Sequence, residues 1–264
     1  MQAKYELANE IFKTDKERGL LVFLAIIEDL TALTEEDIKL KEMAVYSVID
    51  YFSTIQDCKR MGKLLQEIRP LLANCPQTKT AKIIKSAFDE LIKIPNSLND
   101  SIIICKDIID WCAKEKRTFL KLRMEVKLAN LYFMKQLHKD ALNLISILKV
   151  EIKKIEDVTL HVDVNLTETK IHIELENVPK AKASLTAVKT AATSINLSPG
   201  TQVEIDLLSG ILAAEDRDYN TGYSYFYEAM QMFMKLNDNV SSLKTLLYMM
   251  LCKIMSNHLS LIHI

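Results

Sequence analysis

Residues 128–145 read LANLYFMKQLHKDALNLI, and the spacing of their small and large side chains indicates the fold class. A small and an aromatic residue lie on one expected helix, and a small and an aliphatic residue lie on the next. These four positions are Ala129, Tyr132, Ala141 and Ile145. In tetratricopeptide repeats this order lets the two helices of a hairpin approach closely while the larger side chains fill the gap. The stretch therefore predicts a helical hairpin.

The same pattern recurs later in the chain. The further copies are Ala181 with Leu185, and Gly210 with Gly222 and Phe226. Successive second-helix positions, Ala141, Ala181 and Gly222, are 40 and 41 residues apart, whereas a standard repeat has about 34 residues. We therefore expect an all-α fold, a right-handed α-solenoid of tetratricopeptide-like hairpins with lengthened helices and essentially no sheet.

Composition agrees with an all-helical chain. Only 5 of the 264 residues are Gly and 5 are Pro, which argues against collagen, flexible linkers and turn-rich β-sandwiches. The chain is 49% hydrophobic with a net charge of -1, so it is neither a disordered tail nor drawn as a whole to nucleic acid or anionic lipid. Periodicity predicts helices at 2–13, 17–31, 36–56, 58–73, 77–93, 99–114, 116–134, 138–155, 159–176, 178–195, 200–216, 219–236 and 240–255.

The last expected helix is apolar around nearly its whole circumference, so we expect it to be buried on all sides. One broad face should pack on the helix at 219–236; it consists of Leu243, Leu246, Leu247, Met250, Leu251 and Ile254. The other face would need a further domain, because a solenoid requires a polar cap and residues 259–264 are apolar. We expect a solenoid over residues 1–257, a tail over 258–264, and self-association through this helix.

Nothing near the N-terminus is long enough to span a membrane. The longest early apolar run, Leu20 to Ile27, is far shorter than the about 20 residues that a bilayer requires, so we expect a soluble intracellular protein with no membrane partner. The cysteines are odd in number and form no CxxC motif, which predicts buried reduced thiols. They are Cys58, Cys75, Cys105, Cys112 and Cys252.

Charge is distributed in three segments. Residues 1–57 carry a net charge of -6, residues 58–154 carry +10, and residues 155–264 carry -5. The densest basic stretch consists of Lys114, Lys116, Arg117, Lys121, Arg123 and Lys127. It is a solvated helix face, a docking face for an acidic protein partner, or a nucleic-acid-binding face. Because no exposed aromatic residues are expected between these basic residues, nucleic acid is disfavoured.

No pattern in the sequence indicates catalysis or metal binding. The HExxH, GxxxxGK[ST], GxGxxG and GxSxG motifs are absent, and isolated glycines cannot form a phosphate-binding loop. His161 and His172 share a helix face but lie about 16 Å apart along its axis, too far to bind one metal ion. The acidic run at 35–37 should begin a helix and complement its dipole. We expect no catalytic residue, no metal and no cofactor.

Four longer segments are similar to one known family. They are residues 111–120 (WCAKEKRTFL), 177–186 (NVPKAKASLT), 223–229 (YSYFYEA) and 247–255 (LYMMLCKIM). These segments resemble the family of 26S proteasome lid subunits in which a tetratricopeptide-like solenoid precedes a PCI domain, and the resemblance runs from about residue 40 to 257. Because residues 256–264 do not continue the family sequence, we expect the solenoid without its PCI domain.

The resemblance implies a non-catalytic scaffold subunit. Such a protein would brace the proteasome lid against the ATPase ring and the outer ring of the 20S core, in cytoplasm and nucleus, for degradation of ubiquitylated proteins. Two alternatives stay open. One is the paralogous COP9 signalosome subunit of the same architecture, and the other is a helical-repeat protein that binds nucleic acid through the basic middle region.

Overall fold

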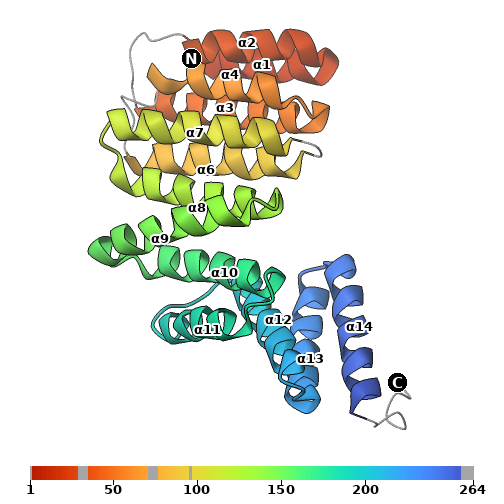
Figure 1. Cartoon of the computed structure of the whole chain (residues 1–264). Coiled ribbons are helices and arrows are strands. Elements are labelled where there is room, and N and C mark those ends of the chain that lie inside the picture. The colour runs from red at the N-terminus through yellow and green to blue at the C-terminus, as the bar shows by residue number, and fades with distance from the viewer. Residues whose placement is uncertain (1, 29–34, 71–76, 95–96, 257–264) are drawn as a thin grey trace. The chain divides into compact units, whose positions relative to one another are not determined.

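The computed structural model describes residues 2–28, 35–70, 77–94 and 97–256, and within these ranges it contains thirteen α-helices and no β-strand (Figure 1). The helices are α1 (Gln2–Thr14), α2 (Lys16–Glu28), α3 (Glu35–Ile55), α4 (Cys58–Glu67), α6 (Gln77–Lys93), α7 (Leu98–Lys114), α8 (Thr118–Met134), α9 (His138–Ile155), α10 (Val158–Glu174), α11 (Val178–Ala192), α12 (Pro199–Glu215), α13 (Tyr219–Lys235) and α14 (Asn239–Met255). The expected all-α fold is confirmed.

The chain divides into two compact units, residues 1–124 and 125–264, with the division inside α8. In the first unit, α3 packs against α2, α4 and α6, and α4 packs in turn against α7. In the second unit, α10 packs against α9 and α11, and α11 to α14 follow one another in chain order. Because each helix contacts mainly its near neighbours in the chain, each unit is a stack of helical hairpins rather than a closed bundle.

Most of the turns between these helices share one backbone conformation. A residue other than glycine adopts a left-handed conformation directly before the next helix cap, at Gln56, Lys116, Gln136, Glu156, Glu176, Arg217 and Asn237. In the second unit, Gln136, Glu156 and Glu176 lie 20 residues apart, and so do Arg217 and Asn237. Two helices with their turns therefore take about 40 residues, which accounts for the 40- and 41-residue spacings in the sequence.

The side chains that follow these turns start the next helices. Asp157 accepts hydrogen bonds from the backbone N–H groups of Thr159 and Leu160, and Asn177 accepts one from the N–H of Lys180. These bonds satisfy donors that a helix leaves unpaired at its first turn. The chain can therefore make tight helical turns with almost no glycine.

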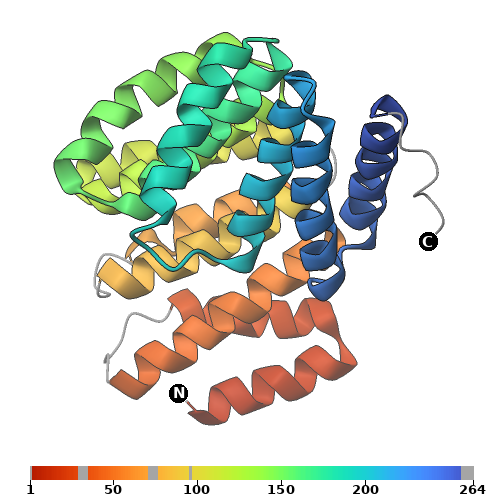
Figure 2. The same cartoon turned by 90° about the horizontal axis from the view of Figure 1, so that it is seen from below.

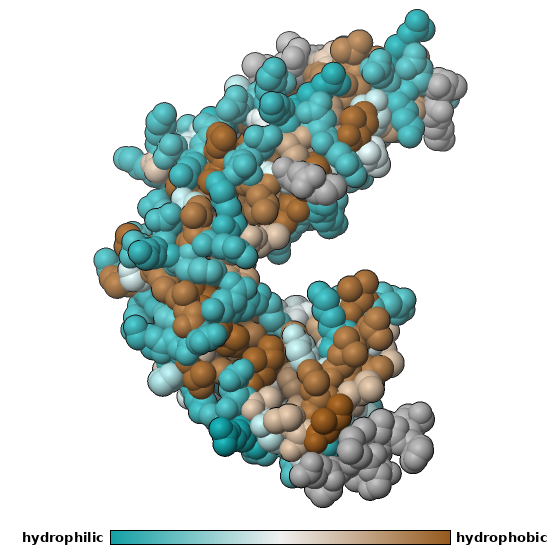
Figure 3. Space-filling model, turned by 45° about the vertical axis from the view of Figure 1, so that its right-hand side comes forward, coloured by the Kyte–Doolittle hydropathy of each residue, from teal (hydrophilic) through white to brown (hydrophobic). Residues whose placement is uncertain are grey.

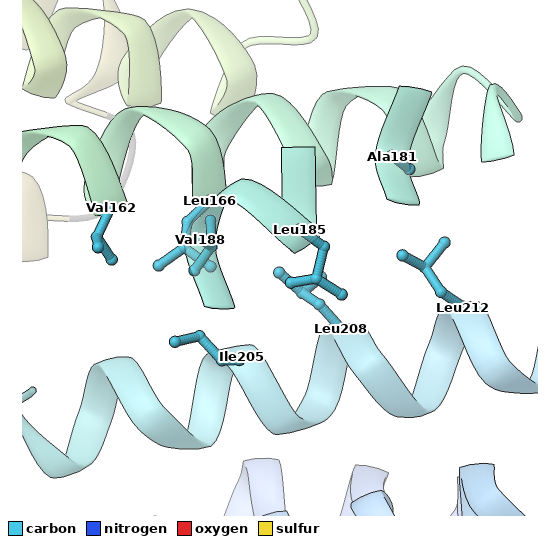
Figure 4. Close-up of a cluster of buried hydrophobic side chains, with 8 residues drawn as sticks. All are labelled: Val162, Leu166, Ala181, Leu185, Val188, Ile205, Leu208 and Leu212. Atoms are coloured by element: carbon cyan, nitrogen blue, oxygen red, sulfur yellow. The ribbon is translucent and has the colours of Figure 1, made fainter. Parts of the chain in front are cut away.

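The core of the second unit lies between α10, α11 and α12. Figure 4 shows aliphatic side chains of the three helices pointing toward one another. They are Val162, Leu166, Ala181, Leu185, Val188, Ile205, Leu208 and Leu212. Ala141 and Ala181 are fully buried, as the repeat alignment predicts for positions where paired helices cross.

Two glycines mark the closest approach of α12 and α13. A Cβ atom at Gly210 would lie 2.7 Å from the ring of Phe226, and one at Gly222 would lie 3.2 Å from the carbonyl oxygen of Gly210. Neither position has room for a side chain without movement of its neighbours. The repeat pattern that placed Gly210, Gly222 and Phe226 together therefore has a steric cause.

Most helix boundaries agree with the sequence. In the range expected as one helix, 58–73, α4 ends at Glu67 and residues 69–70 are again helical, while 71–73 lie outside the described residues. The helix expected at 178–195 ends earlier, at Ala192. The acidic run at 35–37 begins α3 as predicted, but its side chains lie outside the described ones. Over the described ranges, none of the helices has the length and apolar character needed to cross a membrane.

Burial of the last helix, α14, differs from the prediction. Its buried residues are Ser242, Thr245, Met249 and Cys252. The face that was expected to pack on α13 is exposed instead, at Leu243, Leu246, Leu247, Met250, Leu251 and Ile254. The small residues allow a close crossing with α13, because a Cβ at Gly222 would lie only 3.6 Å from the Cys252 sulfur. The expectations that α14 is buried all round and that its leucines contact α13 are both wrong.

The cysteines behave as reduced thiols in the described part of the chain. Cys58, Cys105, Cys112 and Cys252 are free and buried, as predicted, and Cys75 lies outside the described residues. Burial raises the pKa of the Cys58, Cys112 and Cys252 thiols, which keeps them protonated at neutral pH.

Candidate partner-binding surface

The basic stretch expected as a docking face lies at the corner between α7 and α8. Lys114 is the last residue of α7, and Lys116 lies in the following turn with φ 55°. Both are exposed, while Lys121 and Arg123 on α8 are partly exposed. Lys127, further along α8, belongs to the second unit. The corner thus carries four basic residues at the surface of the first unit.

Arg117, the sixth predicted basic residue, has a different environment. Its exposed fraction is only 8%, and its guanidinium carbon lies 5.2 Å from the ring centroid of Trp111. Arg69 lies 5.8 Å from the same centroid and forms an ion pair with Asp107, which also accepts a 2.9 Å hydrogen bond from Gln66. Cation–π contacts of desolvated cations contribute about 2 kcal/mol. Arg117 therefore stabilises the fold here and is not part of the exposed surface.

The side chains around Trp111 also affect the pKa of a neighbouring thiol, that of Cys112. Burial raises the pKa of Cys112 to about 11, although the positive charges of Arg117 and Arg69 act in the opposite direction. Desolvation is the larger effect, so the thiol stays protonated at physiological pH. A protonated buried thiol is a poor nucleophile, and the cluster is a packing element.

An aromatic residue lies within the basic surface. Phe119 is 41% exposed, and the Arg123 guanidinium lies 4.5 Å from its ring centroid. The expectation that no exposed aromatic residue lies between these basic residues is therefore wrong. The spacing of four residues between Phe119 and Arg123, which places both on one helix face, was the signal that could have indicated the pair. Exposed arginine and aromatic residues are frequent anchors of protein interfaces.

We define the basic corner surface as Lys114, Lys116, Phe119, Lys121 and Arg123. Its charges favour an acidic partner, and its single ring offers one apolar anchor. Proteins that bind single-stranded nucleic acid combine such charges with several aromatic residues, on which successive bases stack. One aromatic residue therefore fits an acidic protein surface better than a nucleic acid.

The histidines do not form a metal or catalytic site within the described residues. His138 lies 3.4 Å from Glu174, and His161 and His172 occupy separate turns of α10. Burial lowers the pKa of His161 and His172, so both are neutral at pH 7. In the described part of the chain, no three His, Cys, Asp or Glu side chains are grouped so that they could bind a metal ion. His258 and His263 lie outside the described residues.

One polar hollow lies where α4 and α7 begin. It has a volume of about 380 Å³ and is lined in part by Asp57, Cys58, Ser97 and Asp100. The Cys58 thiol has a pKa raised chiefly by burial, and no histidine lines the hollow. The Cys58 thiol in this hollow is therefore not activated as a nucleophile.

Comparison with protein families gives one match that covers half of the chain. Residues 1–135 match the model of the 26S proteasome regulatory subunit RPN6 N-terminal domain. This range includes residues 1–39, which precede the resemblance recognised in the sequence, and it also includes the basic corner surface.

Whole-chain comparison gives relatives of the same kind. The 26S proteasome non-ATPase regulatory subunit 11 homolog of Arabidopsis thaliana is 40% identical over 96% of this chain and 60% of its own length. The probable 26S proteasome regulatory subunit rpn6 of Schizosaccharomyces pombe is 38% identical over 98% of this chain and 62% of its own. The Saccharomyces cerevisiae subunit RPN6 is 43% identical over 82% of this chain and 51% of its own. The chain thus spans between half and two thirds of these relatives.

Solved structures support the fold alone. A signal-transduction ATPase with a tetratricopeptide repeat sensor, from Pyrococcus horikoshii, superposes with a TM-score of 0.59 at 17% identity, over 98% of this chain and 38% of that one. BtubC of P. vanneervenii gives a TM-score of 0.57 at 10% identity, over 89% of each chain. The first of these neighbours contains helical repeats, in agreement with the stacked hairpins described above.

Proposed function

Because the chain belongs to the family of the 26S proteasome regulatory subunit RPN6, we propose that it is a non-catalytic scaffold subunit of the proteasome regulatory particle. The observation that carries this proposal is the match of residues 1–135 to the RPN6 N-terminal domain, together with 38–43% identity to proteasome subunits over most of the chain.

The proposed scaffold connects three parts of the proteasome in cytoplasm and nucleus. It contacts lid subunits, the ATPase ring and the outer ring of the 20S core, and it braces them for degradation of ubiquitylated proteins. Stacked hairpins suit this task, since a helical repeat presents a long surface whose residues lie far apart in sequence. Support for partners within the proteasome comes from the family, whose members compared above are 26S proteasome regulatory subunits.

Affinity capture tests this proposal. An epitope-tagged chain is expressed in cells, captured under native conditions with ATP, and its co-purifying proteins are quantified by mass spectrometry. We expect lid, ATPase and 20S subunits to be enriched together relative to a tagged unrelated helical-repeat protein. Recovery of COP9 signalosome subunits, or of no proteasome subunit, would contradict the proposal.

We further propose that the basic corner surface binds an acidic surface of another proteasome subunit. Lys114 and Lys116 are exposed, and Arg123 stacks on the half-exposed ring of Phe119. Charged side chains at an interface rim guide association, while an aromatic anchor contributes more of the binding free energy. Arg117, buried on Trp111, is excluded from this surface although it lies in the same basic stretch.

Charge reversal separates this docking role from a merely solvated surface. The variant Lys116→Glu/Arg123→Glu should reduce co-purification of proteasome subunits at least several-fold and leave helicity unchanged, because exposed charges contribute little to folding. The matched control is Lys153→Glu/Lys154→Glu, which reverses two exposed charges at the end of α9. Equal recovery with both variants would show that the basic corner surface does not bind a partner.

A further inference from the structure

A hollow between α2 and α4 in the first unit, which we call the apolar hollow, is lined mainly by apolar side chains. Helix α3 packs against both of these helices (Figure 1), and its buried Phe52 lines the hollow. Leu20 and Leu24 line it from α2, and Leu64 lines it from α4. Its volume is about 240 Å³, whereas a cavity of about 150 Å³ already holds a benzene molecule. The apolar hollow therefore has room for one large apolar side chain.

Three exposed charged side chains of α4 line the same hollow and form its rim. They are Arg60, Lys63 and Glu67, and their spacing of three and four residues places them on one face of the helix. Arg60 forms an ion pair with Asp57 at 3.2 Å, so Lys63 is the positive charge that a partner can reach beside the apolar side chains. Glu67 provides a negative charge one turn further along α4. The rim is therefore positive toward the start of α4 and negative toward its end.

The dimensions of the apolar hollow fit a short helix. Its walls belong to two helices, and a groove of this kind receives the apolar face of an amphipathic helix in many complexes. On α4 the lining extends from Arg60 to Glu67, which is about 10 Å or two helical turns. Extended segments bind in a different way, by adding a strand to the edge of a sheet, and the described residues form no β-strand. The occupant that fits is about two turns of helix.

We propose that the apolar hollow binds a helix of another protein that carries one large apolar side chain and, three or four residues from it, a carboxylate. The apolar side chain enters between Leu24 and Leu64, against Phe52, and the carboxylate meets Lys63 at the rim. The site is separate from the basic corner surface, whose residues belong to α7, α8 and the turn between them. It is a second docking site, and it does not depend on the assignment to the proteasome.

The two parts of this contact have different roles. Burial of the apolar side chain provides the affinity, because the hydrophobic effect is proportional to the apolar area removed from water. The ion pair at the exposed rim adds little affinity and chiefly selects the partner. A partner with a lysine in place of the carboxylate would bring two positive charges together beside Lys63, which disfavours binding. Glu67 disfavours a carboxylate at the other end of the hollow, so the rim specifies on which side of the apolar side chain the carboxylate lies.

Selection from a displayed peptide library tests the chemistry of the partner. The probe is a library of helical peptides with two randomised turns, selected on the purified full chain and counter-selected on Leu24→Asp, which places a carboxylate in the wall of the apolar hollow. We expect at least about tenfold enrichment of peptides with Leu, Met or Phe and, three or four residues away, Asp or Glu. The matched control Ile103→Asp, at a site 65% exposed on α7, should still bind them. No enrichment over the counter-selection, or enrichment of Lys or Arg beside the apolar residue, would overturn the proposal.

Charge exchange tests the role of Lys63 with variants that leave the core intact. A selected acidic peptide is titrated by fluorescence anisotropy against the wild-type chain, Lys63→Glu and Glu67→Lys, whose helicity circular dichroism should show to be unchanged because both residues are exposed. Lys63→Glu should weaken binding several-fold, and a peptide with Lys in place of its carboxylate should regain affinity for this variant. Glu67→Lys, the matched control of opposite sign on the same helix, should not weaken binding of the acidic peptide. Equal weakening by both variants, or no effect of Lys63→Glu, would overturn the proposal.

Discussion

Helices α10 and α14 lie in the same unit but differ in burial. α10 contains many polar residues and is buried to a large extent, whereas α14 is mostly apolar and mostly exposed (Figure 3). α10 buries residues around most of its circumference, including polar Asn165, Thr167, Thr169 and His172. α14 is nearly all apolar in its last three turns, yet only four of its residues are buried. α10 packs against helices on both sides in the stack, whereas the described contacts of α14 are with the preceding hairpin (Figure 2). In a helical repeat, position in the stack decides burial more than composition does.

Buried Asn165 and Thr169 in α10 are tolerated because their side chains have hydrogen-bond partners. The Thr169 hydroxyl lies 2.9 Å from the Ser184 hydroxyl on α11 and 2.8 Å from the backbone carbonyl oxygen of Asn165. The Asn165 side chain donates to the carbonyl oxygen of His161 at 2.7 Å. Hydrogen bonds of this kind remove most of the free-energy penalty for burying a polar group. They allow α10 to be central without being wholly apolar.

Truncating the leucine at the corresponding position of each helix should give the largest difference in stability between α10 and α14. Leu166→Ala in α10 should lower the free energy of unfolding by about 2 to 5 kcal/mol, because it leaves a cavity between three helices. Leu247→Ala in α14 removes a side chain that is 53% exposed and should change it by less than about 0.5 kcal/mol. Urea denaturation of both variants, below the concentration of self-association, measures the difference. Equal losses would mean that α14 is covered as well as α10 is.

Overpacking should have the next largest effect. Ala181→Leu enlarges a fully buried position where α11 crosses α10, and we expect a loss of about 1 to 3 kcal/mol in the free energy of unfolding. Ala183→Leu on the exposed side of the same helix is the control and should be nearly neutral. If thermal midpoints of the two variants coincide, the alignment of Ala181 with the repeat pattern is wrong.

Replacement of two buried threonines by valine compares the polar contacts of the helices. Thr169 has a hydroxyl partner on another helix, while the described hydrogen bond of Thr245 is to the carbonyl oxygen of Ser241 on its own helix. We expect Thr169→Val to lower the free energy of unfolding by about 1 kcal/mol and Thr245→Val to change it less. Chemical denaturation decides between them, and a larger loss for Thr245→Val would contradict the assigned network.

Lowering the pH should reduce the free energy of unfolding, because His172 in α10 is buried in its neutral form. Burial is the main cause that lowers the pKa of this histidine in the folded chain, so the unfolded chain binds the proton more readily. Its contribution to stability is complete above the unfolded pKa of about 6.5 and is lost as pH falls toward the lower folded pKa. Between pH 7.5 and 5.5, urea midpoints of the wild type should fall more steeply than those of His172→Gln. Parallel pH profiles would show that His172 does not titrate in this way.

The helices and their packing positions could be predicted from the sequence, whereas the turns between them could not. The helices, the fully buried Ala141 and Ala181 and the glycine contact of α12 with α13 follow from spacing, because they depend on residues near in sequence. The left-handed turns were not predicted, since they use Lys, Gln, Glu, Arg and Asn rather than glycine. Glycine scarcity therefore indicated long helices without showing how the chain turns between them.

The residues of the basic corner surface could be predicted only in part, for a different reason. The sequence grouped Arg117 with its basic neighbours, but Trp111 lies six residues earlier, on α7, and its ring contacts the buried guanidinium of Arg117. Conversely, Phe119 counts as a core residue by composition but is half-exposed beneath Arg123. In α14, the wrong face was assigned to α13 because leucine is more hydrophobic than serine and threonine. Small residues are needed where two helices cross closely, and Ser242 and Thr245 are buried for that reason.

Gradient sedimentation of cell extract tests the central claim, membership in an assembled proteasome, most directly. The tagged chain is followed through a glycerol gradient run with ATP, alongside the peptidase activity of the 26S particle. We predict that a substantial fraction of the chain sediments with that activity, and that Lys116→Glu/Arg123→Glu shifts it toward the top while Lys153→Glu/Lys154→Glu does not. A wild-type chain found only at the top of the gradient, as monomer or dimer, would contradict the assignment of a proteasomal scaffold.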